Sequence, residues 1–577
     1  MAGSTSVNAT SQKPKAAGDE SSKVKSKEGD KKGSSGGSSM GGFLGFIETV
    51  GNKLPHPFWL FVIIAGIVAV SSWIGSMVGM SAVDPASGET VYVKNLLTSE
   101  GLSMMVTDAV ENFVSFPPLG VILVVMLGVA VAEQTGMLSA AIRAMVARVS
   151  PKMLTFMVAL AGVTGSVASD AIYVIIIPLG AMAFHAKNRS PVVGAMVAFA
   201  ASSAGFNSSL ILNITDLLLA GISTSAANLV DDAYEVSPLA NIFFVIPSAI
   251  VLSLIITAVT ELYVDKKARD LVDHDEIDES ELSFDDASKD PDELAEESDS
   301  AENEDAQDDS ESSGPVTDED LELAPHEVKG LIWAGVTLVV FMVIYFLLLF
   351  IPGSPFARPD EGFMESPLIR QVAVPITLIF FLTGLVYGLV AKTITQASDV
   401  PDFMAKGLKS MLPMMVLFFV VAQFLAWFQW SNLGAWTAIT GSELLQRWDL
   451  PTVVLFACFV IMVAVINLFI TSGSAQWALM APIVVPMMMY VGISPEATQM
   501  LYRMGDSPTN ILTPMSPYFA LALTYLQQYY KKAGVGTLIS LSLPYSLSMI
   551  IGWFLFFLLW YFAGIPLGPG TPMTYGG

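Results

Sequence analysis

The sequence has only one cysteine, Cys458, and four histidines in 577 residues. A single thiol excludes an internal disulfide and a thiolate metal cluster. Charged residues are also scarce, at 14%, whereas 53% of the residues are hydrophobic. Several apolar runs reach the roughly 20 residues that span a bilayer. The composition therefore predicts an all-α polytopic membrane protein rather than a soluble domain.

The few charges are concentrated in two polar segments. The net charge of −25 comes entirely from residues 270–327, which hold 26 Asp and Glu against one Lys. This composition cannot bury a core, so residues 265–327 are predicted to form a disordered cytoplasmic loop, either a solvated linker or a docking segment. Residues 1–40, with seven Lys and four acidic residues, are predicted to form a disordered cytoplasmic tail. Neither segment indicates a nucleic-acid partner.

Lys and Arg mark the cytoplasmic ends of the apolar runs, because cytoplasmic loops carry an excess of both. The basic tail places the N-terminus inside, and alternation along the chain leaves the C-terminus outside. Nine transmembrane helices in contact with lipid are predicted, at residues 55–80, 119–138, 191–222, 239–264, 328–351, 372–391, 411–430, 495–526 and 538–562.

Two further apolar runs are long but broken in the middle. Residues 153–184 contain the polar break GSVASD and have basic residues at both ends, so both ends are expected on the cytoplasmic side. Residues 453–490 contain TSGS and lie in a stretch without Lys or Arg between Arg447 and Arg503. Non-helical backbone at membrane depth needs protein or water around it. Both runs are therefore predicted to be re-entrant hairpins, entering from opposite sides.

The order of these segments predicts an inverted repeat. Residues 41–264 and 352–564 each hold two helices, a hairpin and two helices, and the linking helix 328–351 inverts the second copy; residues 565–577 form a C-terminal tail. Gly165-Ser166 and Gly473-Ser474 are each followed, after eleven residues, by a proline, Pro178 and Pro486 respectively. This shared spacing supports the repeat.

The helix after each hairpin is also interrupted by polar residues and proline. The interruptions are GFNSSLILNITD from Gly205 and RMGDSPTNILTPMSP from Arg503. Proline frees backbone carbonyls, and the N-termini of half-helices attract anions. Two broken helices facing two hairpin tips predict a binding site near the membrane midplane, with Asn207, Asn213 and Asn510 lining its cavity.

Three motifs, SVASDAIYVIIIPLGAMAF, TSGSAQWALMAPIVVPMM and YRMGDSPTNILTPMSPYF, resemble signatures of the AbgT family of bacterial membrane transporters. The likeness runs from about residue 41 to residue 564, apart from the acidic loop. It implies a homodimer in the bacterial inner membrane, with nine helices and two hairpins per protomer and an elevator-like motion. It also implies ion-driven transport of p-aminobenzoyl-glutamate or related folate-pathway aromatics such as sulfonamides.

The resemblance also assigns functional positions. It implies substrate contacts at Trp477, Arg503, Ser474, Pro514 and Pro495. It also assigns functional positions at Asp170, Asp506 and Asn467. From their oxygen atoms we predict ion coupling by Na⁺ or H⁺, with a Na⁺ site near Asn467, Ser474 and Asp506. The sequence departs from the family pattern at Gln476, where Lys is common, and at Asn213, where Gly is usual.

The chemistry of these residues fits an aromatic carboxylate. The guanidinium of Arg503 suits a carboxylate, and Trp477 offers a face for an aromatic ring. Each has an alternative: Arg503 can form a salt bridge with Asp506 on the same helix, and Trp477 can be a packing residue. Asp170 can bind Na⁺, exchange a proton or cap its hairpin, and Asn467 can ligate Na⁺ or form an ordinary interhelical hydrogen bond.

Other functional classes are less consistent with the sequence. An intramembrane serine protease built on TSGS needs a base beside the serine, and the four histidines, at positions 56, 185, 274 and 326, lie at span ends or in loops. No enzyme activity is therefore expected. A passive channel does not require opposed broken hairpins. The main alternative is an ion-coupled carrier of dicarboxylates or short-chain fatty acids, which has less use for an aromatic side chain.

Overall fold

The computed structural model describes residues 55–85, 88–147, 149–168, 171–271, 323–351, 353–358 and 366–576. The chain divides into two units, Met1–Leu44 and Gly45–Gly577, and every described residue belongs to the second. The predicted N-terminal tail and most of the predicted acidic loop lie outside the described residues, as does Asp170. The described elements are helices except for one antiparallel pair, β1 (Ser81–Val83) and β2 (Thr90–Tyr92).

Within the described residues, seven helices are long and apolar enough to cross a membrane. They are α2 (Pro57–Met77), α5 (Pro117–Gln134), α11 (Ile242–Val259, extended to Ala268), α14 (Pro325–Phe350), α16 (Ala373–Ala391), α18 (Leu412–Trp430) and α24 (Val535–Phe562). Each lies within a few residues of a predicted span. The other two predicted spans are each interrupted, and their pieces are shorter.

The first interrupted span forms two helices, and the second forms three. The first consists of α9 (Pro191–Ala204) and α10 (Ile214–Ala227), and the second of α22 (Pro495–Asp506), the 3₁₀ helix η7 (Ser507–Leu512) and α23 (Pro517–Tyr529). Proline is the first residue of α9, α22 and α23, where its missing N–H costs no helical hydrogen bond. The two polar motifs therefore break their helices at the predicted positions.

The two long broken runs each form a pair of helices. The first pair is α7 (Leu154–Thr164) and α8 (Ala171–His185), with the 3₁₀ turn η1 (Gly165–Ala168) after α7; the second is α20 (Thr452–Asn467) and α21 (Gly473–Tyr490). Residues at both ends of the first pair meet, because Arg189 donates a hydrogen bond of 2.8 Å to the Thr155 hydroxyl. This contact agrees with a hairpin whose two ends lie together.

Shorter helices complete the described chain. They are α3 (Ser99–Thr107), α4 (Ala109–Val114), α6 (Met137–Val146), the π-helix η2 (Thr260–Val264), α12 (Asp265–Leu271), α15 (Pro367–Arg370), α17 (Asp399–Ser410) and α19 (Leu433–Trp448). α17 has acidic residues in its first turn and Lys409 in its last, as suits the helix dipole.

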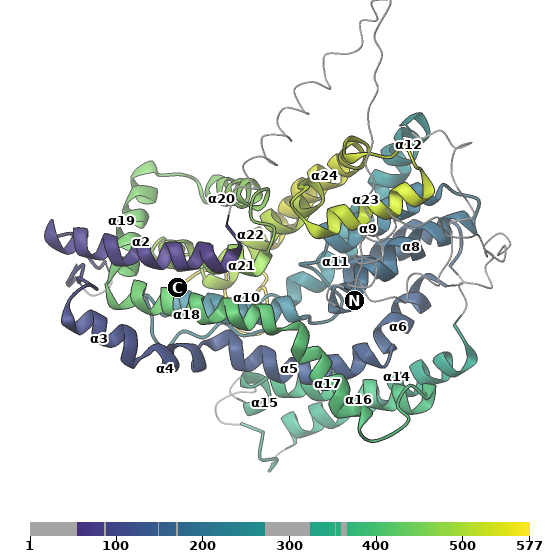
Figure 1. Ribbon diagram of the computed structural model, residues 1–577, viewed down its shortest axis with the longest axis horizontal. Coiled ribbons are helices and arrows are strands. Elements are labelled where there is room, and N and C mark those ends of the chain that lie inside the picture. The colour runs from purple at the N-terminus through teal and green to yellow at the C-terminus, as the bar shows by residue number, and fades with distance from the viewer. Residues whose placement is uncertain are drawn as a thin grey trace, which may run out of the picture. The chain divides into compact units, whose positions relative to one another are not determined.

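The two hairpins pack against the broken helices and bring the two halves together. α7 and α8 pack on α9, while α21 packs on both α10 and α22. The approach of α8 to α9 requires glycine, since a Cβ on Gly194 would lie 2.2 Å from the carbonyl oxygen of Gly180. A second group contains α5, α16 and α14, and α2 packs along α18 (Figure 1).

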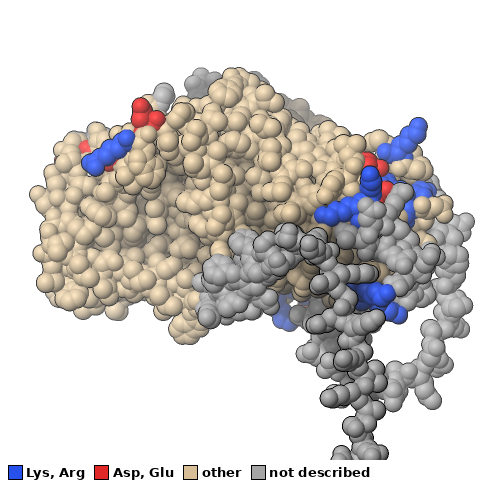
Figure 2. Space-filling view, turned by 90° about the horizontal axis from the view of Figure 1, so that it is seen from above, with Lys and Arg blue, Asp and Glu red and all other residues tan. Residues whose placement is uncertain are grey.

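The surface agrees with a membrane environment. On the face seen in Figure 2, Lys, Arg, Asp and Glu gather at two separate places, and the surface between them carries other residues. α14 is the most exposed of the seven long helices, with only Gly330, Ala334 and Leu349 buried. Such a uniformly apolar exposed helix is stable in lipid rather than in water.

Candidate functional site

A cavity of about 540 Å³ lies where the two hairpins and the two broken helices meet. Ser166 and Tyr173 line it from the first hairpin, and residues 471–474 line it from the second. Asn207 and Asp506 line it from the broken helices. The predicted convergence of the two halves is therefore present, and the four interrupted segments surround one hollow space.

The first broken helix is closed by a capping box. The Asn213 side chain accepts from the backbone N–H of Asp216 at 3.1 Å, and the Asp216 carboxylate accepts from the N–H of Asn213 at 2.9 Å. This arrangement satisfies the first amide groups of α10 inside the protein. It leaves residues 205–213 as a non-helical link that carries Asn207 toward the second half.

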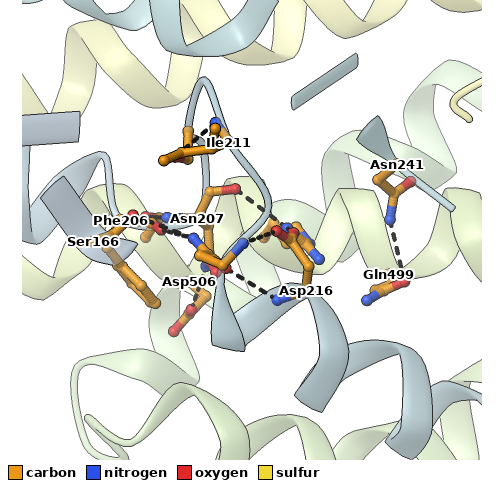
Figure 3. A network of polar contacts seen from close by, with 12 residues as sticks. Ser166, Phe206, Asn207, Ile211, Asp216, Asn241, Gln499 and Asp506 are labelled. Atoms are coloured by element: carbon orange, nitrogen blue, oxygen red, sulfur yellow. Dashed lines mark hydrogen bonds and ion pairs between the residues drawn. The ribbon is translucent and has the colours of Figure 1, made fainter. Parts of the chain in front are cut away.

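Asn207 connects the two halves at the cavity wall. Its side-chain amide donates to Asp506 Oδ2 at 2.8 Å, and its backbone N–H donates to the Ser507 hydroxyl at 3.2 Å. Figure 3 shows Asn207 between Asp506 and Asp216, within one polar network. The second broken helix is thus held at its break by the first.

Asn467, the last residue of α20, holds the second hairpin to the same break. Its amide nitrogen lies 2.7 Å from the carbonyl oxygen of Asp506, 2.8 Å from the Thr509 hydroxyl and 3.0 Å from Asn510 Oδ1. These groups belong to the end of α22 and to η7, where helical bonding is disrupted. Interhelical hydrogen bonding, one of the two expected roles of Asn467, is therefore seen directly.

Arg503 is paired with a residue that the sequence interpretation did not consider. Its guanidinium lies 2.5 Å from Asp216 Oδ1, and the two side chains are 1% and 5% exposed. It also donates to the carbonyl oxygen of Asn207 at 3.4 Å. The alternative considered for Arg503, a salt bridge with Asp506 within α22, is not formed in this structure: Asp506 is bound by Asn207, and Asp216 binds the guanidinium.

The predicted substrate residues are divided by the structure. Ser474 lines the cavity, whereas Trp477, Arg503, Pro495 and Pro514 are not among the described residues that line it. Trp477 is fully buried, its indole N–H donates to the Ser223 hydroxyl at 3.1 Å, and its ring lies 4.5 Å from that of Tyr502. Its packing explains why it does not reach the cavity.

The remaining predicted residues are also divided. Asn207 and Asn510 line the cavity. Asn213 lies behind it and donates to the Ser166 hydroxyl at 3.2 Å, tying the first broken helix to the first hairpin. Gln476, one of the departures from the family pattern, is buried and donates to the carbonyl oxygen of Val463 at 3.1 Å.

Several oxygen atoms near Asp506 suit a small hard cation. Within the described part of the chain, Asp506 Oδ1, Asn207 Oδ1 and Asn467 Oδ1 are buried and have no hydrogen-bond donor. Carboxylate and amide oxygens are the ligands that such cations prefer. The described residues contain no cluster of three His, Cys, Asp or Glu that could hold a metal ion. The donor set therefore fits Na⁺ or a proton better than a transition metal.

Two tyrosines in the cavity were missed from the sequence. Tyr173 of α8 and Tyr518 of α23 both line it, and their rings stack with centroids 3.9 Å apart and an interplanar angle of 11°. Aromatic residues in apolar runs are usually core residues, so nothing in the periodicity distinguished them. The only signal was position, since each follows a polar break within a few residues.

Comparisons with known proteins agree with this architecture. The sequence profile of the AbgT putative transporter family matches residues 42–294 and 302–575. The chain is 35% identical over 529 residues to the p-aminobenzoyl-glutamate transport protein of Escherichia coli K12, covering 91% of this chain and 96% of that protein.

Two solved structures are similar over most of the chain. The YdaH transporter of Alcanivorax borkumensis is 36% identical, with a TM-score of 0.77, and the match covers 89% of this chain and all of that one. MtrF of Neisseria gonorrhoeae, described as illuminating a class of antimetabolite efflux pumps, is 37% identical, with a TM-score of 0.80, and the match covers 92% of this chain and all of that one.

Proposed function

Because the chain belongs to the AbgT transporter family and is therefore a membrane transporter rather than an enzyme, we propose that it is a secondary active, ion-coupled carrier of aromatic carboxylates. Its substrates would be p-aminobenzoyl-glutamate or related folate-pathway antimetabolites such as sulfonamides. The observation that carries this proposal is the cavity, which combines a stacked tyrosine pair with polar hairpin tips and Asp506.

The tyrosines supply the aromatic part of the proposed site. Tyr173 and Tyr518 come from opposite halves, and the face of a tyrosine ring favours an offset-stacked aromatic group. Ser166, Ser472 and Ser474 also line the cavity, and their hydroxyls can donate to carboxylate or amide oxygens. A carrier of dicarboxylates or short-chain fatty acids, the alternative, would use the serines but would gain little from the rings.

Asp506, with Asn467 and Ser474 nearby, is proposed to take the coupling ion, Na⁺ or H⁺. The carboxylate lines the cavity and keeps one oxygen without a donor among the described residues, which supports this role. Asp170, which lies outside the described residues, is proposed as a second ion-coupling group. When bound, the cation would neutralise Asp506, so its presence would change the charge of the cavity wall.

We propose that four residues outside the cavity lining influence substrate binding, either through the lining residues that they support or by contacting the substrate when the hairpins move. They are Arg503, Trp477, Pro495 and Pro514. Arg503 donates to the carbonyl oxygen of Asn207, which lines the cavity, and a movement of Asn207 is proposed to bring the guanidinium nearer to it. Trp477 packs on Tyr502, whose hydroxyl donates to the carbonyl oxygen of Gly473 in the second hairpin. The prolines begin α22 and follow η7, where they keep the broken helix short.

The cavity is proposed to open toward the cytoplasm. Besides the hairpin tips, it is lined by His56, Ser410 and Met411, at the start of α2 and around the start of α18. Lys406 and Lys409 on α17 mark this end as cytoplasmic by the distribution of basic residues. We further propose re-entrant hairpins, an elevator-like motion, and a homodimer in the inner membrane with its N-terminus inside and C-terminus outside.

Transport into and out of reconstituted vesicles tests the proposal. Labelled p-aminobenzoyl-glutamate is offered under an imposed Na⁺ gradient, an imposed proton gradient, or neither. We expect one gradient to drive accumulation, and an unlabelled aliphatic dicarboxylate to compete poorly. If neither gradient moves the compound, or if the dicarboxylate competes equally well, the proposed substrate class is wrong.

A further inference from the structure

Asp216 is a buried carboxylate that faces away from the cavity and has no assigned role in transport. It lies in the first turn of α10, behind Thr215 and Leu218, which line the cavity. One of its oxygens accepts from the backbone N–H of Asn213, and the other from Arg503. The capping box fixes this carboxylate to the backbone, so its position is set by the fold rather than by the pairing.

Arg503 has two carboxylates within reach, and it forms its ion pair with Asp216. Arg503 and Asp506 are three residues apart on α22, a spacing at which side chains of opposite charge can pair. Instead, Asp506 is bound by the Asn207 amide at 2.8 Å, and the guanidinium is held by Asp216. Two buried carboxylates thus lie near the Arg503 guanidinium. Asp216 pairs with it, whereas Asp506, which lines the cavity, does not.

We propose that Asp216 is a positioning residue that holds Arg503 away from Asp506 and thereby keeps Asp506 available for the coupling cation. The inference rests on the proposed ion coupling at Asp506. Without the charge of Asp216, a buried guanidinium would need another anionic partner, because an uncompensated buried charge is strongly unfavourable. Asp506 is one turn away, and pairing with it would block the cation.

Asp216→Asn tests this inference with little damage to the fold. The asparagine oxygen can still accept from the N–H of Asn213, so the cap is retained while the negative charge is removed. The purified variants are unfolded thermally while Na⁺ replaces choline at constant ionic strength, and again across a pH series. A ligand that binds only the folded protein raises its melting temperature, so the size of the shift reports cation binding to the folded protein.

We expect the wild type to respond to one of the two cations, and Asp216→Asn to need at least about tenfold more of that cation for the same shift. The double variant Asp216→Asn/Arg503→Gln removes the competing guanidinium and should regain the wild-type response. A purely structural role for Asp216 does not predict this recovery. Asp216→Glu, which keeps the charge, should respond more like the wild type than Asp216→Asn does.

The outcomes separate this inference from the proposed function. If the wild type responds to neither cation, the ion coupling itself is wrong. If the wild type responds and Asp216→Asn responds with equal affinity, the inference is overturned. It is also overturned if the double variant stays unresponsive. Should Asp216→Asn fail to fold, Arg503→Gln alone must keep the cation response, and its loss there contradicts the inference.

Discussion

The two halves of the protein share one plan but use it differently at the cavity. The first half interrupts its helix with a non-helical link, residues 205–213, and re-enters α10 through a capping box. The second half passes from α22 straight into η7. Among the described residues, Asp506 of the second half is the one carboxylate that lines the cavity. Asp216 of the first half does not line it and pairs with Arg503 instead.

This difference suggests a division of labour between the two halves, in which one half holds functional side chains that the other half supplies. The first half supplies fixed partners, such as Asn207 and Asp216, which are tied down by backbone contacts. The second half supplies the groups that they hold, Arg503 and Asp506. The two halves therefore contribute complementary side chains rather than identical ones.

The largest expected loss of stability comes from removing the guanidinium of Arg503, which belongs to the second half and is bound by residues of the first. Arg503→Ala leaves Asp216 buried without its counter-ion and should cost about 3–5 kcal/mol of stability. Thermal unfolding of the purified protein measures the loss. Asp506→Asn is the matched control: it removes a charge at the cavity wall, keeps an acceptor for Asn207, and should impair gradient-driven transport with little loss of stability. Equal stability losses in the two variants would contradict the division of labour.

The next effect compares two asparagines, one from each half. Asn467→Ala removes the side-chain donor to the Thr509 hydroxyl and to Asn510 Oδ1, and one of two side-chain donors to the carbonyl oxygen of Asp506, and should cost about 1–3 kcal/mol. Asn213→Ala removes a helix cap and should cost about 0.5–2 kcal/mol. Unfolding midpoints of the two variants, measured side by side, test the order. A greater loss for Asn213→Ala would show that the first break is the more tightly held of the two.

A smaller effect should appear in substrate selectivity. Tyr518→Leu removes one ring of the stack, and a lost aromatic pair of about 0.5–1.5 kcal/mol predicts a KM for p-aminobenzoyl-glutamate raised roughly 2- to 12-fold. Tyr173→Leu, from the other half, should act in the same direction, whereas Tyr518→Phe should stay near the wild type. Competition by an aliphatic acyl-glutamate provides the comparison, because its affinity should not depend on either ring.

Trp477→Phe is the control for that experiment. It keeps most of the packing against Tyr502 but loses the hydrogen bond to Ser223. Because phenylalanine keeps an aromatic ring at this position, the preference for the aromatic over the aliphatic compound should be unchanged. A loss of that preference in Trp477→Phe, but not in Tyr518→Leu, would move the aromatic subsite to Trp477.

The smallest effect is expected outside the site, on α17. Hydrogen bonds from the backbone N–H groups of Gln396 and Thr395 lower the pKa of Asp399. A lowered pKa means that the ionised side chain stabilises the fold above its unfolded-state pKa, and that this contribution disappears as the pH falls through the folded-state pKa. The melting temperatures of the wild type and Asp399→Asn should therefore differ slightly at pH 7 and converge in acid, with transport unaffected.

Much of the fold follows from the sequence because lipid imposes simple rules. The apolar runs predicted the seven long helices to within a few residues, and the polar breaks predicted where the two long runs and the two interrupted helices divide. These are local features. Wherever a polar or proline-containing break interrupts a transmembrane helix, the freed backbone groups need hydrogen-bond partners. The family resemblance was confirmed by the family profile and by the relatives, and the motifs that carry it contain these breaks.

The partners of the site residues could not be predicted in the same way. The Arg503–Asp216 pair joins residues 287 positions apart, and the sequence offered a nearer partner, Asp506, at helical spacing. The buried position of Trp477, away from the cavity, likewise involves Ser223 of the other half, which accepts from its indole N–H. Such pairings depend on how the repeats pack against each other, which no local pattern encodes. The cap motif Asn213-x-x-Asp216 was readable, but it indicates only where α10 begins.

The cavity between the two broken helices is proposed to hold the aromatic carboxylate. The most direct measurement is a structure of the protein determined at saturating p-aminobenzoyl-glutamate. We predict density for its ring against Tyr173 and Tyr518, with its carboxylates near Ser474 and the hairpin tips. Density for the ring elsewhere, or a cavity without the compound at saturation, would contradict the account.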